Sequence, residues 1–434
     1  MKITVVGAGY VGLVTGVSLA ASGRHEVTFV EKDPERVDEL RQGRMPIEEP
    51  RLTEVFGAHR DRIAVVDAIE QAEAPDLAFV CVATPIGEGG ESDLQQISSA
   101  MADLRTHPLL HVSVRSTLPP GFSGRLPALL GRPDGARAST NPEFLRQGAA
   151  MQDFAQPSRI VVGRFAETSE DHLGLLEDAY SHVEAPRLTV SVSAAELIKN
   201  AANAFLALKL SFVNELAALS ESYGVEVEDV LKGISLDPRI GSAYMRPGLG
   251  FGGSCLPKEL QVIDVAGRRR GLAMHVARAA AQVNLEQQDR FVHRVLEELP
   301  AANARVGLLG LSFKVDTDDL RGSPAIHVAR RLVQSGHIVT AYDPAVRSER
   351  ARAAVPGIEI APEALEVFRD ADAVVIATEW PQFAALDLAG AASLVRRPLL
   401  FDGRGLIDPA SAIAAGFAYR GVGRPSRDPI PSAA

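Results

Sequence analysis

The sequence predicts an α/β protein with two doubly wound, Rossmann-like domains joined by a long central helix. Three observations predict it. A short β-branched strand at residues 3–6 runs directly into a glycine turn and a helical stretch, as at the start of a βαβ unit. After about residue 301, four strand-like runs alternate with helical stretches. Between these two parts, residues 193–223 contain neither Gly nor Pro, which indicates one long helix.

Length and composition fit a globular protein of about three units. The chain has 434 residues, of which 46% are hydrophobic, and domains average roughly 150 residues. Its formal charge of −10 argues against a nucleic-acid-binding protein. Two cysteines, Cys81 and Cys255, give no disulfide framework and fit a reducing compartment, so we expect a cytoplasmic protein. Outside the glycine-patterned N-terminus there is no uninterrupted apolar run of about 18 residues, and we expect no membrane span.

The N-terminal glycine turn predicts a dinucleotide site. It reads Gly7-Ala-Gly-Tyr-Val-Gly12 and lies between a strand and a helix, which is the context that the G-x-G-x-x-G pattern requires. The first glycine permits the turn, the second admits the pyrophosphate, and the third lets helix pack on strand. We expect the cofactor to contact Gly7, Gly9, Tyr10, Val11 and Gly12.

A carboxylate at the end of the second strand favours NAD as the cofactor. Residues 27–30 form this strand, and Glu31 follows about 20 residues after the last glycine, where a carboxylate binds the ribose hydroxyls. A 2′-phosphate would be repelled there, although the neighbouring cations Lys32 and Arg36 weaken the exclusion of NADP. The alternative for Glu31 is an ordinary solvated carboxylate.

Polar residues follow three further strand-like runs in this part of the chain. Thr84 ends the apolar run that contains Cys81, Thr117 follows residues 111–114, and Glu143 follows residues 138–140. Ligands of open α/β sheets bind at the carboxyl ends of the strands, so these residues are expected at one rim. Thr117, or Ser116 beside it, could instead cap a helix, and Glu143 could be a helix-start carboxylate.

The stretch Gly248-Leu-Gly-Phe-Gly-Gly-Ser-Cys-Leu-Pro-Lys-Glu259 is interpreted as the loop of a nucleophile. Its four glycines are expected to leave N–H groups free to approach a ligand, and Ser254 looks like the N-cap of a helix that ends near Gly267. At this helix start the dipole and Lys258 favour a Cys255 thiolate, the form that attacks a carbonyl. The alternative is a small buried residue in a glycine turn.

The long central helix carries a second candidate pair. Ser193-Ala-Ala-Glu196 matches a capping box, and the apolar run that follows predicts a helix buried between domains or subunits. Lys199 and Asn203 lie four residues apart and so share a face, as an oxyanion-stabilising or acid–base pair would. A solvated lysine is the alternative. Farther along, Arg239 could reach a polyanionic substrate.

The last third predicts a second doubly wound domain without a second dinucleotide site, because it has no G-x-G-x-x-G. Lys314, Arg321 and Arg404 bring cations to the carboxyl edge of its strands, which suits a nucleotide diphosphate. We place domains at residues 1–190 (dinucleotide-binding), 191–300 (central helices and the cysteine loop) and 301–424 (second doubly wound domain), with a flexible tail at 425–434.

Taken together, these stretches resemble the UDP-glucose/GDP-mannose dehydrogenase family over nearly the whole chain. The resemblance rests, in order, on residues 7–12, 141–146, 196–203, 250–258, 313–321, 342–344, 378–380 and 402–404. It implies NAD-dependent, four-electron oxidation of a sugar C6 alcohol to a carboxylate, with Cys255 holding a thiohemiacetal and then a thioester. It also implies that residues 191–300 dimerise and that residues 301–424 bind the UDP sugar. We therefore expect a homodimer or a higher homo-oligomer, and we expect no metal.

The resemblance assigns roles residue by residue. Lys199 and Asn203 would stabilise the oxyanion, Glu143 and Thr117 would serve proton transfer and water, and Arg239 would reach a neighbouring subunit's substrate. Glu259 joins the catalytic group. The expected cofactor contacts also include Lys32, Arg36, Thr84, Thr117, Lys258 and Arg321. The expected substrate contacts are Glu143, Phe144, Leu145, Arg146, Lys199, Asn203, Arg239, Tyr244, Gly252, Phe313, Lys314 and Arg404.

Two carboxylates of the family pattern are altered. Glu259 stands where Asp is usual, and Gln147 replaces the second Glu of the Asn-Pro-Glu-Phe-Leu motif. Family members that act on N-acetylated sugars have a Gly-Gly-His-Cys pattern. Ser254 stands in place of that His and argues against an N-acetylated sugar as the substrate. UDP-glucose is the first candidate substrate, with dTDP-glucose and GDP-mannose as alternatives. A two-electron hydroxy-acid dehydrogenase and a catalytically silent NAD sensor are the competing functions.

Overall fold

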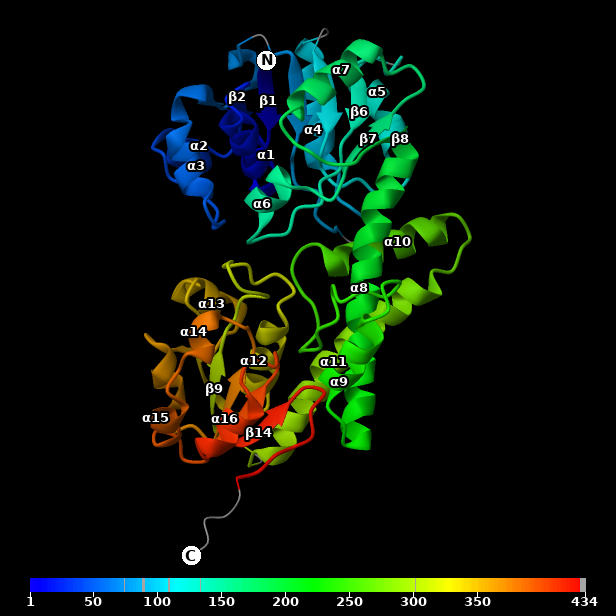
Figure 1. The fold of residues 1–434 in the computed structure, drawn as a ribbon. Helices are drawn as coiled ribbons and strands as arrows, with labels where there is room; N and C mark the ends of the chain where they lie inside the picture. The colour runs from blue at the N-terminus through cyan, green and yellow to red at the C-terminus, as the bar shows by residue number, and fades with distance from the viewer. Residues whose placement is uncertain (74, 88–89, 108–109, 133, 301, 430–434) are drawn as a thin grey trace, which may run out of the picture. The chain divides into compact units, whose positions relative to one another are not determined.

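The computed structural model describes residues 1–429 except 74, 88–89, 108–109, 133 and 301 (Figure 1). The chain forms two compact units. The first unit comprises Met1–Ala202 and Gln261–Ala273, and the second comprises Asn203–Leu260 and Met274–Ala434. Each unit contains one mainly parallel sheet, and a long helix links them, so the predicted α/β class is confirmed.

Among the described residues, the sheet of the first unit has eight strands in the order β3-β2-β1-β4-β5-β6-β7-β8. Their bounds are β1 Lys2–Val6, β2 Glu26–Val30, β3 Ile63–Val66, β4 Leu77–Val80, β5 His111–Val114, β6 Ala138–Thr140, β7 Ile160–Arg164 and β8 Arg187–Ser191. Neighbouring strands are parallel except for β6 and β7. We predicted Cys81 inside a buried strand. The residue is buried, but it lies just beyond the end of β4.

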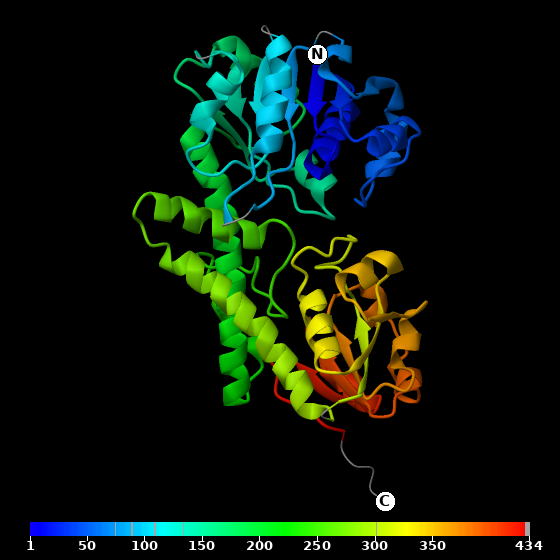
Figure 2. The same cartoon turned by 180° about the vertical axis from the view of Figure 1, so that it is seen from behind.

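Helices cover both faces of this sheet. They are α1 Tyr10–Ala21, α2 Pro34–Arg41, α3 Leu52–Ala58, α4 Gln95–Asp103, α5 Leu126–Leu129, α6 Ala150–Ala155 and α7 Glu170–Ala179. Alternate residues of one strand enter different cores: Val5 packs with Leu13 of α1, whereas Val6 packs with Ile97 of α4. Helices α1 and α4 therefore lie on opposite faces, seen from the two sides in Figures 1 and 2.

In the described part of the second unit, the sheet has six strands in the order β11-β10-β9-β12-β13-β14. Their bounds are β9 Arg305–Leu309, β10 Ile338–Tyr342, β11 Glu359–Ile360, β12 Ala373–Ile376, β13 Leu399–Asp402 and β14 Ala418–Gly421. The helices are α9 Val227–Ser235, α11 His275–Glu298, α12 Pro324–Gln334, α13 Ser348–Ala354, α14 Pro381–Ala384, α15 Leu388–Ala392 and α16 Pro409–Ala414.

The second sheet repeats the central strand order of the first, which fits the prediction of two doubly wound domains. Gly310 follows β9 as Gly7 follows β1, and both have φ near +95°. The difference lies after the turn: α1 begins at Tyr10, but α12 begins only at Pro324. The Asp343 carboxylate accepts the Leu311 and Ser312 N–H groups at 2.8 and 2.9 Å. This turn therefore lacks the adjacent helix N-terminus that binds a pyrophosphate.

Helix α8, Val192–Tyr223, begins in the first unit and continues into the second. Its length confirms the predicted long helix, but its start does not match the predicted capping box. The Ser191 hydroxyl accepts the Ala194 N–H at 3.3 Å, and the Glu196 side chain binds elsewhere. Helix α10, Leu256–Arg269, also runs from one unit into the other.

The first residues of the C-terminal tail contact β14. Arg427 exchanges two backbone hydrogen bonds with Tyr419, at 2.8 and 3.1 Å, and Asp428 forms an ion pair with Arg420 at 2.9 Å. A flexible tail at residues 425–434 stays a prediction. Residues 430–434 lie outside the described residues.

Candidate active site

The glycine turn of the first unit has the geometry that its sequence predicts. Gly7 has φ of 94°, and a Cβ at Gly12 would lie 1.9 Å from the Gly7 carbonyl oxygen. At Gly9 a Cβ would meet nothing within 4 Å, and Gly9 is the residue that precedes α1. The turn thus needs its first and third glycines for folding, while the second leaves open space at a helix N-terminus. This open cradle fits the pyrophosphate of a dinucleotide.

Glu31 is not a freely solvated carboxylate. Its side chain is 12% exposed, and it accepts the Ala8 N–H at 2.9 Å and the Lys32 N–H at 2.9 Å. Arg36 lies 3.5 Å away, whereas the Lys32 ammonium binds Asp103 at 2.7 Å. The carboxylate is therefore fixed beside the glycine turn, where it can accept ribose hydroxyls. The residues present fit an NAD molecule.

Two other residues of the predicted cofactor group are part of the protein's own packing. Val11 is partly buried against the core under the sheet. Tyr10 donates to Glu49, a buried carboxylate that also accepts the Gly148 and Ala150 N–H groups at 2.7 Å each. Glu49 therefore ties the glycine turn to the segment after β6. No motif or spacing in the sequence indicates this role of Glu49.

Thr84 and Thr117 meet at the carboxyl ends of β4 and β5. The Thr84 hydroxyl donates to the Thr117 carbonyl oxygen at 2.9 Å. Neither Thr117 nor Ser116 caps a helix, because the next helical turn begins at Ser123, and the Ser116 hydroxyl donates to the Val82 carbonyl at 2.7 Å. The capping alternative is therefore wrong, and a functional role for Thr117 stays a prediction.

Glu143 and Lys199 form a buried ion pair. The Lys199 ammonium lies 2.9 Å from Glu143 Oε1, and the two side chains are only 5% and 8% exposed. Burial raises the pKa of Glu143, but the charge and hydrogen bond of Lys199, the Leu145 N–H and the Arg115 charge together outweigh burial and hold that pKa below its ordinary value. Glu143 follows β6 in a loop, so it is not a helix-start carboxylate. Lys199 is not a solvated lysine.

The residues next to Glu143 have different surroundings. Phe144 lies under two cations, with Lys199 Nζ 5.4 Å and Arg159 Cζ 3.8 Å from its ring centre. Leu145 donates its N–H to Glu143 Oε2 at 2.6 Å, and Arg146 forms an ion pair with Asp153 at 2.6 Å. The loop after β6 is therefore shaped around the carboxylate. Arg159 is absent from the sequence prediction.

Cys255 lies at the start of α10 with its side chain exposed. The helix begins at Leu256, and the Cys255 carbonyl accepts the Glu259 N–H at 2.9 Å, so Cys255 and not Ser254 immediately precedes the helix. Glu259 is 2% exposed. Burial raises the pKa of the other cysteine, Cys81, to about 12, so Cys81 remains a thiol. Of the two, Cys255 is the candidate nucleophile, with Lys258 in the first turn.

The glycines before Cys255 serve close packing more than ligand approach. A Cβ at Gly252 would lie 2.2 Å from the Gly322 carbonyl, and one at Gly253 would lie 2.8 Å from the Phe313 ring. We expected free N–H groups in this loop, but those of Gly248 and Gly253 are hydrogen-bonded. They donate to Asn214 and to the Arg321 carbonyl, at 2.9 Å each.

The segment packed on this loop contains two of the three cations predicted in the last third of the chain. Lys314 Nζ lies 5.6 Å from the centre of the Phe313 ring. Arg321 donates to both oxygens of Asp319, and this pairing raises the pKa of the guanidinium. The nearby Cys255 also raises that pKa. The arginine side chain remains 69% exposed. The cysteine loop and the cationic segment therefore form one cluster within the second unit.

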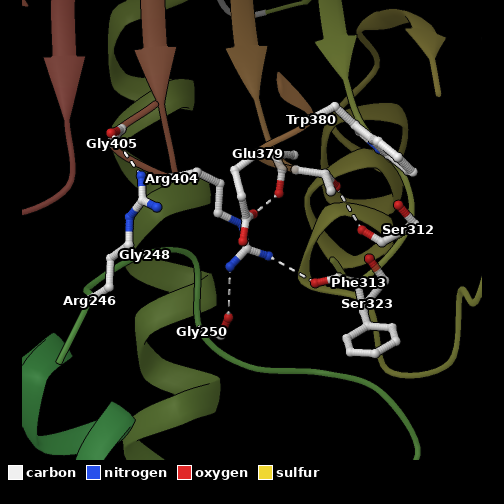
Figure 3. A network of polar contacts seen from close by, with 12 residues as sticks. Arg246, Gly248, Gly250, Ser312, Phe313, Ser323, Glu379, Trp380, Arg404 and Gly405 are labelled. Atoms are coloured by element: carbon white, nitrogen blue, oxygen red, sulfur yellow. Dashed lines mark hydrogen bonds and ion pairs between the residues drawn. The ribbon is translucent and has the colours of Figure 1, made fainter. Parts of the chain in front are cut away.

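Arg404 joins three segments of this cluster, as Figure 3 shows. Its guanidinium donates to the carbonyl oxygens of Ala377, Phe313 and Gly250, at 2.8, 3.3 and 3.4 Å, and lies 3.3 Å from Glu379. The backbone N–H of Arg404 donates to Asp402 at 3.0 Å. Arg404 therefore holds the cysteine loop against the sheet edge, a role that the sequence does not indicate.

The remaining predicted residues lie in less enclosed places. Arg239 pairs with Asp237 in a turn and has an 88% exposed side chain. Tyr244 has φ of 61°, a backbone conformation that non-glycine residues adopt mainly at turns and functional sites. Asn203 lies one turn beyond Lys199 on α8 and is partly exposed. Among the described residues, no group of three or more His, Cys, Asp or Glu side chains could hold a metal ion.

One known protein family matches the chain in three consecutive parts. The NAD binding domain of the UDP-glucose/GDP-mannose dehydrogenase family matches residues 1–184, its central domain matches residues 193–286, and its UDP binding domain matches residues 307–409. The glycine turn, the cysteine loop and the Lys314 segment fall in the first, second and third match, respectively.

Individual relatives match over almost the full length. UDP-glucose 6-dehydrogenase YwqF of Bacillus subtilis is 36% identical, with 98% of each chain covered. UDP-glucose 6-dehydrogenase of Rhizobium meliloti is also 36% identical, with 98% of this chain and 100% of the relative covered. Among solved structures, a UDP-glucose dehydrogenase from Pyrobaculum islandicum has a TM-score of 0.88 and 36% identity, with 98% of each chain covered.

Proposed function

Since this chain belongs to the UDP-glucose/GDP-mannose dehydrogenase family of NAD-dependent oxidoreductases, we propose that it oxidises the C6 alcohol of UDP-glucose to the carboxylate of UDP-glucuronate. The observation that carries this proposal is the exposed Cys255 at the start of α10, in a loop packed against the cationic Phe313 segment. A nucleophile next to a site for phosphates suits a nucleotide sugar. Relatives named for UDP-glucose support the choice of sugar.

The proposed reaction has two oxidations and one hydrolysis. NAD, when bound in the first unit, accepts the hydride that leaves C6 in each oxidation. After the first oxidation the Cys255 thiolate adds to the C6 aldehyde, so that the second hydride loss leaves a thioester. Water attacks the thioester, the carboxylate forms, and the thiolate is released. Glu259 and Thr117 are assigned to the water, Glu143 to proton transfer, and Lys199 with Asn203 to the oxyanion.

The cofactor and substrate contacts are proposed on the same basis. Glu31 and the glycine turn bind the dinucleotide, with Thr84, Lys258 and Arg321 as further cofactor contacts. Phe313, Lys314 and Arg404 bind the nucleotide diphosphate, together with Arg239 and Tyr244. The division of the chain at residues 190, 300 and 424, and the cytoplasmic location, stay predictions.

The count of NADH molecules per substrate tests the function. Purified protein is given NAD and one limiting sugar nucleotide, either UDP-glucose, dTDP-glucose, GDP-mannose or an N-acetylated UDP sugar. We expect two NADH per UDP-glucose and a uronic acid product by mass spectrometry. One NADH per substrate would indicate a two-electron dehydrogenase. Two NADH from another sugar nucleotide alone would replace UDP-glucose as the substrate.

Replacing Lys314 with Ala is expected to raise KM for UDP-glucose by about 10-fold or more, because a charged contact to a phosphate contributes about 1.5–3 kcal/mol. The Kd of NAD should stay within about twofold, since the loss is confined to substrate binding. Steady-state kinetics and NAD titration measure both quantities. Unchanged kinetics would show that Lys314 is an ordinary surface lysine.

We also propose that the chain forms a homodimer through α8. Leu197, Phe205, Phe212 and Leu219 are 52–62% exposed and recur every seven or eight residues, so they form one apolar stripe along the helix. Helix α8 is also the one described helix long and apolar enough to cross a membrane. However, Ala217 lies in the core of the second unit and Lys199 is paired in the first, so α8 belongs to the fold. A second copy of this stripe is the proposed occupant.

Replacing both Phe205 and Phe212 with Glu is expected to convert the dimer to a monomer, because it places charges in the middle of the apolar contact. Light scattering coupled to size-exclusion chromatography measures the molar mass. A control changes an exposed residue of another helix, Thr53→Glu in α3 for example. The proposal is wrong if the wild-type chain is monomeric at micromolar concentration.

A further inference from the structure

Glu196 is a buried carboxylate whose side-chain partners come from one irregular segment. The residue is 4% exposed. Its Oε2 accepts the Gly121 N–H at 2.7 Å, and its Oε1 accepts both the N–H and the hydroxyl of Ser123 at 2.6 Å. A buried carboxylate costs free energy unless it is hydrogen-bonded, so three short bonds to one segment fix that segment firmly.

Asn200 adds a second attachment one turn farther along α8. The residue is fully buried, and its Nδ2 donates to the Leu118 carbonyl at 3.0 Å and to the Glu196 carbonyl at 2.8 Å. Residues 196 and 200 lie on the same face of the helix because they are four apart. This face of α8 therefore holds the segment near its beginning and at its end.

The segment depends on these attachments. It connects β5 with the helical turn at Ser123, and it contains Pro119 and Pro120, which have no N–H to donate. Its first part is held from the other side by Thr84, which donates to the Thr117 carbonyl. Thr117 is thus fixed between the end of β4 and the first turns of α8.

The same turns of α8 also hold Glu143, through Lys199. Thr117 follows β5 and Glu143 follows β6, which are neighbouring strands in register from Val112 to Val114. One helix therefore aligns two strand-end residues to which the proposed function assigns proton transfer and water. We propose that Glu196, assisted by Asn200, is the positioning residue that sets Thr117 relative to Glu143. This inference rests on the proposed function and deepens it.

Replacing Glu196 with Gln tests the inference. A carboxamide keeps the size but offers one acceptor oxygen, and its NH₂ group would face N–H donors. We expect kcat to fall about 30-fold, because a displacement of about 1 Å in a reacting group can cost up to 10²-fold. KM values for NAD and the sugar nucleotide should change less than about twofold. Hydrogen exchange of the Gly121 and Ser123 amides in the ligand-free protein should become at least about 10-fold faster.

A control in the same unit is Asp76→Asn, at an exposed carboxylate that also accepts a backbone N–H. The Asp76 carboxylate accepts the Lys2 N–H at 2.9 Å, but it lies at the amino end of β4, at the opposite edge of the same sheet. This variant should keep wild-type kcat and normal exchange in the 118–123 segment. A drop in kcat as large as that of Glu196→Gln would show that removing any such carboxylate from this unit impairs the enzyme, and would overturn the inference.

A double-variant cycle separates positioning from general stability. If Glu196 acts through Thr117, adding Glu196→Gln to Thr117→Val should lower kcat less than about twofold further. A full additional 30-fold loss would mean that Glu196 does not act through Thr117. Should Glu196→Gln fail to fold, Ser123→Ala removes only one of the three hydrogen bonds. It should lower kcat about threefold, and this loss should also disappear in the Thr117→Val background.

A failure of the positioning role of Glu196 can be distinguished from a failure of the proposed function. If the wild-type chain oxidises no sugar nucleotide, the proposed function is wrong, and exchange at Gly121 and Ser123 then decides whether Glu196 holds the segment. Faster exchange in Glu196→Gln supports that hold, and unchanged exchange overturns it. If the wild-type chain is active but the variant keeps full kcat, only the positioning role is lost.

Discussion

Replacing Cys255 with Ser is expected to lower the net rate of UDP-glucuronate formation by at least about 10³-fold and to leave a covalent acyl ester on the protein. A serine hydroxyl is neutral at pH 7 and is a poorer nucleophile than a thiolate. Its ester is also less activated toward water than a thioester. Both differences act on the second half of the reaction, after the first hydride has left C6.

Intact-protein mass spectrometry after incubation with UDP-glucose and NAD measures the ester directly. The control is Cys81→Ala, because Cys81 is the other cysteine, is buried, and remains a thiol. It should retain turnover and show no added mass. If Cys255→Ala still releases two NADH per UDP-glucose at the wild-type rate, Cys255 is only a residue of a glycine-rich turn and the proposed mechanism fails.

The parts of this fold that follow local rules could be predicted from the sequence. The strand, glycine turn and helix at the N-terminus are specified within about 20 residues, and Gly7, Gly9 and Gly12 have the three separate environments expected of them. The long helix ends at Tyr223, directly before Gly224, as predicted. The same holds for the strand ends that carry Thr117 and Glu143.

What could not be predicted depends on contacts between distant segments. Ser193 and Glu196 have the spacing of a capping box, yet Glu196 binds residues 121–123, more than 70 positions away in the sequence. Arg404 looks like a rim cation, but its guanidinium binds backbone carbonyls of three segments. Side-chain type and spacing record that a carboxylate or a guanidinium is present. They do not record which backbone groups the fold brings to it.

Replacing Lys199 with Met is expected to lower kcat by about 10²–10³-fold and to destabilise the protein by about 3–5 kcal/mol. The ammonium is the ion-pair partner of the buried Glu143 carboxylate at 2.9 Å. Without it, burial dominates, and the pKa of Glu143 should move from below its ordinary value to above it. A larger fraction of the proposed proton-transfer group would then be protonated at a given pH and unable to accept a proton.

The direction of the pH dependence of stability should reverse with this change. In the wild type, the depressed pKa of Glu143 contributes stability that is present above the unfolded pKa of about 4.3 and is lost as pH falls through the folded value. In Lys199→Met the folded pKa is raised, so this residue's contribution is greatest below about pH 4.3 and declines as pH rises toward the folded value. Urea unfolding at several pH values between about 4 and 8 measures the difference.

A second change separates the charge from the chemistry. Adding Glu143→Gln to Lys199→Met removes the unpaired buried charge, so the free energy of unfolding should recover by several kcal/mol and lose its altered pH dependence. Turnover should not recover, because neither the proton-transfer carboxylate nor the oxyanion-stabilising ammonium is restored. Lys199→Arg, which keeps a cation, should preserve the low pKa of Glu143 and the wild-type pH dependence. If the double variant regains turnover together with stability, Lys199 and Glu143 serve the fold and take no part in the oxidation.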